Sequence, residues 1–427
     1  SLGVVFPKRE LLAQMNSLHR RTVLLAAGGL ILLLVVSGLV ARSIARPLRR
    51  MAAATDQVAQ GDLDIDLSDI HGEDEVGQLA QSFMRMTHGL KERDRIRDTF
   101  GRYLTREVVN RLLESKDGLR LGGENREITM IMSDLRGFTA LTSSMPPQQV
   151  LAFLNRYLGK MVEILIDYQG TIDEIVGDGI LAFFGAPEPL EDHPARAVAC
   201  ALKMQAAMDE VNSLNEADGL PRLDMGVAVN TGTVVVGNIG SEKRTKYGAV
   251  GSQVNFTGRM ESFTVGGQVL ISSSTYERLS EFLDIRNVLQ VEMKGVPGKI
   301  TLYDVRGIKG PYDAHLPDRD ETPVPLESQI NVKVYRLDQK ILAGDGTTAI
   351  ITHISLTSAV MIFDYAIGQW EDIRIVILSE EMAEVPGAVY AKVVSTAEVK
   401  DGWEATVRFT SVSPEAYRMF REAVKGA

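Results

Sequence analysis

Cysteine is almost absent from this sequence, since Cys200 is the one cysteine among 427 residues. A single thiol excludes a disulfide framework and a thiolate zinc site, and it fits a reducing compartment. An excess of positive charge is also missing, because 46 Lys and Arg stand against 56 Asp and Glu, a net charge of -10. Without a broad basic surface to release counterions, the chain is not expected to bind nucleic acid. With 45% hydrophobic and 24% charged residues, the chain is expected to fold into two or three domains.

A start methionine is missing as well, so we expect the chain to be a fragment or a processed product. Residues 22–41 contain no charge and are flanked by arginines on both sides. A helix of that length crosses the ~30 Å hydrocarbon core of a bilayer, and it is too long and too far into the chain for a signal peptide. We predict a transmembrane helix at 22–41 and, at 1–21, the end of a truncated extracytoplasmic sensor. The basic residues on the two sides are nearly balanced, so charge alone leaves the orientation open.

Two heptad-like stripes follow the apolar segment, separated by a polar connector at 61–72. Such stripes are typical of helices that pack as a parallel bundle between chains. With Pro47 opening the first helix and Asp74-Glu75-Val76-Gly77 opening the second, residues 42–94 resemble a HAMP linker; the alternative is an ordinary amphipathic hairpin. A charged coupling helix is predicted at 95–123. The stripe positions are Leu48, Met51, Thr55 and Val58, then Val76, Leu79, Phe83, Met86 and Leu90.

From residue 124 to residue 308, apolar runs of strand character alternate with helical patterns. Residues 128–133 are predicted as a strand, and residues 147–168 and 193–214 as helices. Residues 170–185 are predicted as a β-hairpin around a Gly-Asp-Gly turn, and residues 222–238 as strand-rich. This order predicts an α+β domain, with a sheet covered by helices.

Residues 309–329 are rich in Pro and Asp and lack periodicity, which indicates a linker. From residue 330 to residue 427, six short β-branched runs precede a closing helix. Short strands separated by turn signals predict a small β-barrel domain.

Two carboxylates lie at the ends of apolar runs in the α+β segment. Asp134 ends the first strand, and Asp178 lies 44 residues later at the hairpin turn. The chain after Asp134 turns into a helix start, where the backbone N–H groups of Gly137, Phe138 and Thr139 can cradle phosphate. Two carboxylates and a phosphate cradle are what a two-Mg²⁺ phosphoryl-transfer site requires.

A second group of polar residues lies further along the chain. If residues 254–259 are helical, Asn255 and Arg259 are i and i+4 and share one face. An amide and a fixed cation can hold a ribose and stabilise charge that grows on a phosphorus centre. Lys294 is a further candidate for the terminal phosphates.

Taken in order, SDLRGFTAL, IVGDGILAFFG, GVAVNTGTVVVGNIGS and YGAVGSQVNFTGRMES resemble the class III nucleotide cyclase catalytic domain. The resemblance implies a ferredoxin-like α+β fold that acts as a head-to-tail homodimer with interfacial sites. One protomer would hold two Mg²⁺ or Mn²⁺ ions per site with Asp134, Asp178 and the Leu135 carbonyl. The other would supply Asn255 and Arg259 for catalysis. Lys294 would come from that same second protomer.

The resemblance also assigns base recognition to Glu174 and Gly248. Adenylate-forming members carry Lys at the first position, whereas guanylate-forming members carry Glu. Guanine presents two donors that one carboxylate can accept together, while adenine N1 would face Glu174 lone pair to lone pair. Because unpaired polar groups in such a site give selectivities of ~10⁴, GTP is the favoured substrate. ATP is the alternative, since Gly248 has no side chain to read the base.

GTP and Mg²⁺ are cytosolic, so the resemblance implies a protein of the bacterial inner membrane with its catalytic domain in the cytoplasm. The C-terminal barrel resembles a PilZ domain, whose motif is matched by Ser355 but has His353 and Ser358 at the other two positions. Arg336 stands near the place where paired arginines are expected. These departures weigh against cyclic di-GMP and favour an unknown ligand, a protein contact or a regulatory role. A catalytically silent HAMP and PilZ scaffold is the alternative of another class.

Overall fold

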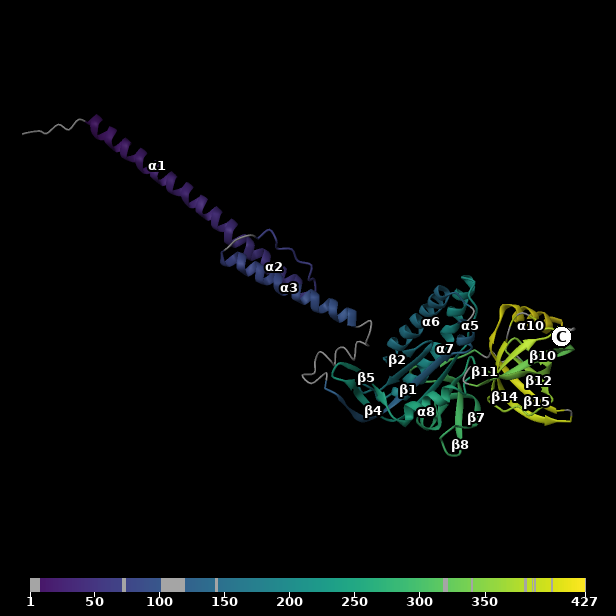
Figure 1. Ribbon diagram of the computed structural model, residues 1–427. Helices are drawn as coiled ribbons and strands as arrows, with labels where there is room; N and C mark the ends of the chain where they lie inside the picture. The colour runs from purple at the N-terminus through teal and green to yellow at the C-terminus, as the bar shows by residue number, and fades with distance from the viewer. Residues whose placement is uncertain are drawn as a thin grey trace, which may run out of the picture. The chain divides into compact units, whose positions relative to one another are not determined.

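The computed structural model describes residues 8–70, 74–100, 120–142, 145–317, 322–338, 341–379, 382–385, 387, 389–400 and 402–426. The chain divides into two compact units, 1–103 and 104–427. Figure 1 shows the N-terminal helices in purple and blue, the central sheet in teal and green, and the C-terminal barrel in yellow. Residues 101–119, which hold most of the predicted coupling helix, lie outside the described residues.

The first unit is helical, as the apolar run and the two heptad-like stripes predict. A segment long and apolar enough to cross a membrane lies within residues 18–59, and none of its most apolar window is buried. Met51, Ala54, Leu67 and Ala80 form a small core between the two helices after it. The elements are α1 Lys8–Val40, the π-helical η1 Ala41–Ala45, α2 Arg46–Ala59 and α3 Glu75–Phe100.

The first half of the second unit is a mixed sheet in the order β2-β3-β1-β4-β6-β8-β7, with β5 paired to β4 and β9 to β8. The pairing is antiparallel except between β4 and β6, which are parallel. The strands are β1 Gly122–Leu135, β2 Thr171–Val176, β3 Gly179–Phe184, β4 Met225–Ser241, β5 Arg244–Val250, β6 Val269–Ser272, β7 Leu283–Glu292, β8 Lys299–Ile308 and β9 Ala314–His315.

Alternate residues of the central strands enter different cores, because successive side chains point to opposite faces of a sheet. Ile131 of β1 packs with α6 and α7, whereas Met130 belongs to a cluster that Val254 of α8 also contacts. The helices therefore cover both faces of the sheet, which confirms the α+β prediction. They are α5 Phe138–Thr142, α6 Pro147–Asp167, α7 His193–Ala217, α8 Ser252–Glu261 and α9 Ser273–Leu279.

The C-terminal half of this unit is a closed barrel in the order β10-β11-β12-β15-β14-β13, so the prediction of a six-stranded barrel is confirmed. The predicted linker contains more structure than its composition indicates. Within it, β9 pairs with β8 and β10 begins at Val324, because Val324 and Pro325 pair with Ile354 and His353 of β11. The strands are β10 Val324–Asp338, β11 Ile341–Ile354, β12 Ser358–Phe363, β13 Asp372–Ile377, β14 Val389–Val399 and β15 Gly402–Val412; helix α10 is Pro414–Gly426.

Helix α6 offers a direct test of the sheet–helix core. Phe153 is 1% exposed and its ring lies 6.0 Å from that of Phe138, while Leu151 on the same helix is 58% exposed. We expect Phe153→Ala to lower the free energy of unfolding by about 3–5 kcal/mol, because it leaves a cavity. Leu151→Ala should change it by no more than about 0.5 kcal/mol. Chemical denaturation of the purified chain measures both, and equal losses would contradict this packing.

Candidate functional site

The two predicted metal-ligand carboxylates lie side by side at the end of β1. Antiparallel pairing of Ser133 with Ile180 brings the end of β1 beside the β2–β3 turn. The Leu135 N–H donates a hydrogen bond of 3.0 Å to Asp178 Oδ2. A Cβ on Gly179 would lie 3.6 Å from Asp134 Oδ1, so the two acidic side chains share one small space. Residues 44 positions apart in sequence are therefore brought together by strand pairing.

Asp178 is only 7% exposed. Burial and the neighbouring carboxylate of Asp134 raise the pKa of Asp178 to about 7. Two hard oxygen donors that repel each other in a buried place suit a divalent cation, which offsets their shared negative charge. Among the residues the structure describes, no group of three or more His, Cys, Asp or Glu side chains is placed to hold a metal ion.

Arg136 and Glu261 brace this pair, and sequence reasoning did not single out either residue. Their side chains are 10% and 11% exposed and form an ion pair, while Arg136 Nη2 also lies 3.9 Å from Asp134 Oδ2. Burial lowers the pKa of Arg136, and the charge of Asp134 opposes that shift. The ion pair links the end of β1 to the last residue of α8. A signal was present, because both residues stand inside the motifs SDLRGFTAL and FTGRMES.

The predicted phosphate cradle follows directly after Arg136. Gly137 has φ +70°, a conformation that glycine adopts without strain and that starts the five-residue helix α5. Phe138 is buried against Phe153, so its side chain anchors the loop and its backbone alone could contact a ligand. Thr139 is exposed. The cradle therefore consists of a glycine turn and a single helical turn.

Asn255 and Arg259 do lie on a helix, since α8 spans both residues, and both side chains are exposed. Buried Thr257 holds α8 to the sheet, because Asn230 Nδ2 of β4 donates to its hydroxyl at 3.3 Å. Arg259 lies against the turn that contains Lys294, since its Nη1 would be 3.3 Å from a Cβ on Gly295. The structure thus brings Arg259 to the Lys294 turn, and Lys294 is also exposed.

Glu174 is exposed on β2 and forms a cluster with two residues that sequence reasoning missed. Lys246 Nζ of β5 lies 3.4 Å from Glu174 Oε2 and 3.6 Å from Asp173 Oδ2. The Asp173 side chain is 3% exposed and its Oδ1 lacks a hydrogen-bond partner. Burial raises the pKa of Asp173, and the charge of Lys246 opposes that shift. Lys246 could have been found, since it stands two residues before Gly248 on one strand and therefore on the same face.

Gly248 lies next to this cluster, and neighbouring atoms occupy the space that a side chain at position 248 would need. A Cβ on Gly248 would stand 2.3 Å from Asp173 Oδ1 and 3.3 Å from Lys246 Cε. The Asp173 carboxyl thus fills the volume that a side chain at position 248 would need. Replacing Gly248 by a larger residue would require Asp173 to move. The predicted residues therefore fall into three groups: the metal carboxylates with their loop, the α8 residues with Lys294, and the Glu174–Gly248 pair.

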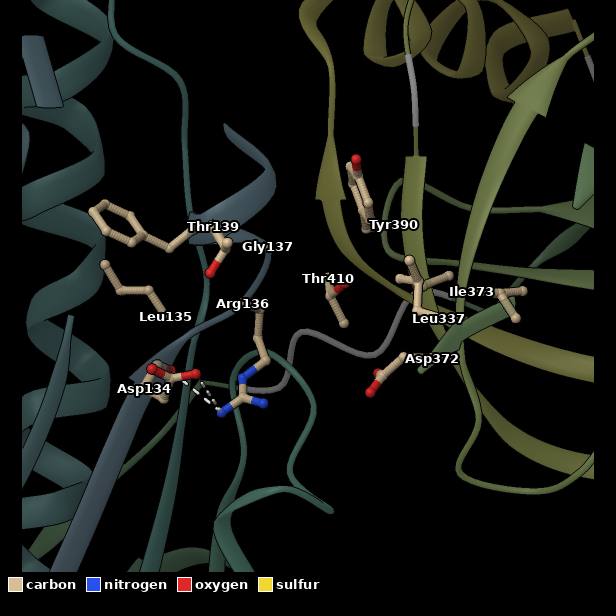
Figure 2. Close-up of a pocket in the computed structure, with 12 residues that line it drawn as sticks. Asp134, Leu135, Arg136, Gly137, Thr139, Leu337, Asp372, Ile373, Tyr390 and Thr410 are labelled. Carbon is tan, nitrogen blue, oxygen red and sulfur yellow. Dashed lines mark hydrogen bonds and ion pairs between the residues drawn. The ribbon is translucent and has the colours of Figure 1, made fainter. Parts of the chain in front are cut away.

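Figure 2 shows that barrel residues face the loop after β1. Asp134, Arg136 and Gly137 line a cavity of about 80 Å³ together with Asp372 and Tyr390 of the barrel. The partially matched PilZ motif lies elsewhere on the barrel and is used internally. Ser355 accepts hydrogen bonds from the N–H groups of Thr357 and Ser358 at 3.1 and 2.9 Å.

His353 and Arg336, which were also compared with the PilZ pattern, have partners within the barrel as well. His353 Nδ1 lies 3.0 Å from the Thr352 hydroxyl. Arg336 donates to the Ala366 carbonyl at 2.7 Å and pairs with Glu371 at 3.2 Å. These contacts show a six-stranded barrel with internal polar contacts at the compared positions, and they do not establish a PilZ domain.

Comparison with protein families agrees with the fold. Residues 123–307 match the family described as adenylate and guanylate cyclase catalytic domain, and residues 39–92 match the HAMP domain. Through these domains the chain belongs to the class III nucleotide cyclases that carry a HAMP domain. The predicted cyclase and HAMP resemblances are thereby confirmed.

Particular relatives include both guanylyl and adenylyl cyclases. The guanylyl cyclase Cya2 is 49% identical in sequence. The match covers 46% of this chain and 100% of that structure, with a TM-score of 0.45. The adenylyl cyclase CyaB from P. aeruginosa is 31% identical, covering 47% of this chain and 100% of that one at a TM-score of 0.43. The uncharacterized protein Rv1320c of Mycobacterium tuberculosis is 35% identical over 239 residues, 56% of this chain. The match spans 40% of that relative's own length.

The buried Arg136–Glu261 pair gives a test of the bracing described above. We expect Glu261→Gln to lower the free energy of unfolding by about 3 kcal/mol, because it leaves a buried guanidinium with less compensating charge. Glu277→Gln on exposed α9 is the matched control and should leave stability nearly unchanged. Chemical denaturation of the purified variants measures the difference. A Glu261→Gln variant as stable as the control would refute the bracing role.

Proposed function

We propose that this chain is a membrane-bound guanylate cyclase that converts GTP to cyclic GMP and pyrophosphate in signal transduction. The observation that carries the choice of GTP is the exposed carboxylate of Glu174, which lies next to Lys246 at the position that the family uses for the base. A carboxylate accepts from the N1–H and the 2-amino group of guanine together. Adenine offers an acceptor at N1, which would leave both groups unpaired.

Asp134, Asp178 and the Leu135 carbonyl would hold two Mg²⁺ or Mn²⁺ ions, as the facing carboxylates support. When bound, such ions would neutralise the phosphates and favour attack by the ribose 3′-hydroxyl. The loop at Gly137–Thr139 would bind phosphate oxygens through its backbone. In the reaction, the 3′-oxygen forms a bond to the α-phosphorus while the bond from that phosphorus to the pyrophosphate oxygen breaks.

Asn255, Arg259 and Lys294 would act from the second protomer of a head-to-tail homodimer. Asn255 would orient the ribose, Arg259 would stabilise the charge that develops at the α-phosphate, and Lys294 would hold the terminal phosphates. Exposure of all three side chains supports this role, because they are available to a partner subunit. The exposed HAMP stripe residues Leu48 and Met86, at 43% and 50%, support dimerisation as well.

The membrane setting forms part of the same proposal. Residues 22–41 would span the bacterial inner membrane, with 1–21 outside and the HAMP domain at 42–94 leading through 95–123 to a cytoplasmic cyclase domain at 124–308. Residues 309–329 would connect it to the PilZ-like barrel at 330–427. One apolar helix followed by a HAMP domain supports this order. Adenylate cyclase activity is the second candidate, because a relative at 31% identity is an adenylyl cyclase.

The nucleotide preference can be tested through Glu174. We expect the purified chain with Mn²⁺ to prefer GTP over ATP, and we expect EDTA to abolish product formation. Glu174→Gln should lower the ratio of kcat/KM for GTP to that for ATP on the order of 100-fold, because an amide cannot accept both guanine donors. Cyclic nucleotide formation from each substrate is the measurement.

Exposed Glu188, just after the hairpin, supplies the matched control, and Glu188→Gln should leave the ratio unchanged. More cyclic AMP than cyclic GMP from the unchanged chain would favour the adenylate cyclase alternative. Absence of product from both nucleotides would favour a silent signalling scaffold.

The interfacial site can be tested by mixing inactive chains. Asp134→Ala and Arg259→Ala should each abolish activity, because every site of either homodimer lacks one essential group. Co-expressed, they should recover about a quarter of wild-type activity, since half of the dimers are mixed and each mixed dimer has one intact site of two. Co-expression of Asp134→Ala with Asp178→Ala is the control and should recover nothing. Equal recovery in both mixtures would exclude sites shared between subunits.

A further inference from the structure

The β13–β14–β15 side of the barrel reaches the loop that carries the predicted metal and phosphate ligands. A Cβ on Gly137 would stand 2.5 Å from Cβ of Ser411 in β15, so the Ser411 side chain of the barrel lies directly against the loop. In Figure 2, Tyr390, Asp372 and Thr410 of the barrel face Gly137 and Arg136 across the cavity. The barrel is therefore a wall of the proposed phosphate site.

Two side chains fasten the barrel to the end of α8. The Lys392 side chain is 4% exposed; its ammonium pairs with Asp372 at 3.3 Å and donates a hydrogen bond to the Ser262 carbonyl. The Trp370 ring lies edge-on to Phe263 with the ring centroids 6.0 Å apart. Ser262 and Phe263 follow directly after the helix that carries Asn255 and Arg259. A buried lysine on a backbone carbonyl and an aromatic pair are contacts of a formed interface.

The space between the two parts is too small for a nucleotide. The cavity beside Gly137 has about 80 Å³, whereas pockets for ligands of that size have roughly 300–1,000 Å³. A triphosphate placed there would lack room for its oxygens. Substrate can bind at this loop after the barrel moves away.

The barrel turn that resembles a ligand motif lies at a second contact with the catalytic half. Thr357 and Arg408 line a cavity of about 60 Å³ together with Asp224 and Gly266. Asp224 belongs to the same framework as the loop, since its carbonyl accepts from the Arg136 N–H at 2.7 Å. The turn between β11 and β12 thus lies against the chain's own catalytic half, in a space too small for a dinucleotide.

We propose that the surface formed by Arg136–Thr139, Ser262 and Phe263 is a docking surface for the chain's own barrel, and that the docked barrel blocks nucleotide entry. Trp370 and Lys392 are the two anchors. Withdrawal of the barrel opens the phosphate site and releases the cyclase. The proposal rests on the cyclase activity proposed above for its effect on turnover, while the docking itself is independent of that activity.

The anchors can be removed one at a time in the full chain. Trp370→Gly removes the ring at a backbone position with φ +71°, which glycine accepts, and Lys392→Met keeps the length of the side chain without its charge. We expect each variant to raise basal cyclic nucleotide formation on the order of tenfold, because the closed state loses an anchor. Lys333→Met removes a lysine that pairs with Glu384 on the barrel and should leave the rate unchanged.

A disulfide lock separates docking from folding and from turnover. In the chain with Phe263→Cys and Trp370→Cys, oxidation of both thiols to mixed disulfides by a short bis-methanethiosulfonate cross-linker should join the two parts, and buried Cys200 should stay reduced. The oxidised chain should bind a fluorescent non-hydrolysable GTP analogue at least about tenfold more weakly than the reduced chain. Reductant should restore both binding and activity.

Each result bears on one of the two proposals. Anchor variants with unchanged or lower turnover, with wild-type thermal unfolding, would overturn the blocking role. Equal binding of the analogue by oxidised and reduced chains would overturn it as well. If no variant makes cyclic nucleotide while oxidation still weakens analogue binding, the cyclase activity fails and the docking surface stands.

Discussion

Antiparallel pairing of β1 with β3 is the constraint on which the site depends. It places Asp178 at the hairpin turn against Leu135, and so holds a second carboxylate beside Asp134 in a buried place. Burial and their mutual repulsion raise the pKa of Asp178 to about 7. Arg136 pairs with Glu261 and lies near Asp134, and it thereby ties the acidic pair to α8.

The same construction explains why distant motifs act together. Arg136 leaves β1 toward Glu261, the last residue of the helix that carries Asn255 and Arg259. A change in the position of α8 therefore acts on the loop at Gly137 through one buried ion pair. Lys392 and Trp370 of the barrel contact Ser262 and Phe263, which follow α8. Since Ser411 also lies against Gly137, the barrel contacts both ends of this connection.

The sequence predicts the elements well where periodicity is local. The hairpin at 170–185 and the six barrel strands follow from alternation and turn residues over a few positions. The sequence does not predict contacts between strands that are far apart along the chain. Asp173 and Lys246 are 73 positions apart and meet because β2 lies beside β5, which no local pattern encodes. Likewise, β10 begins at Val324 because β11 supplies a partner that composition cannot show.

Two glycines illustrate what remains hidden in a sequence. In the sequence, Gly137 and Gly248 are notable only for lacking a side chain. Gly137 lies in the predicted phosphate-binding turn, and Gly248 lies at the predicted base-recognition position. In the fold, each absence makes room for a neighbour: Ser411 of the barrel at Gly137, and the Asp173 carboxyl at Gly248. At Gly248 the neighbour belongs to the proposed base-recognition cluster itself, so under that proposal the position would contribute through Asp173 and Lys246. At Gly137 the neighbour is Ser411 of the barrel. The missing side chain, which leaves the backbone of the predicted phosphate loop accessible, therefore also makes room for the barrel that covers this loop.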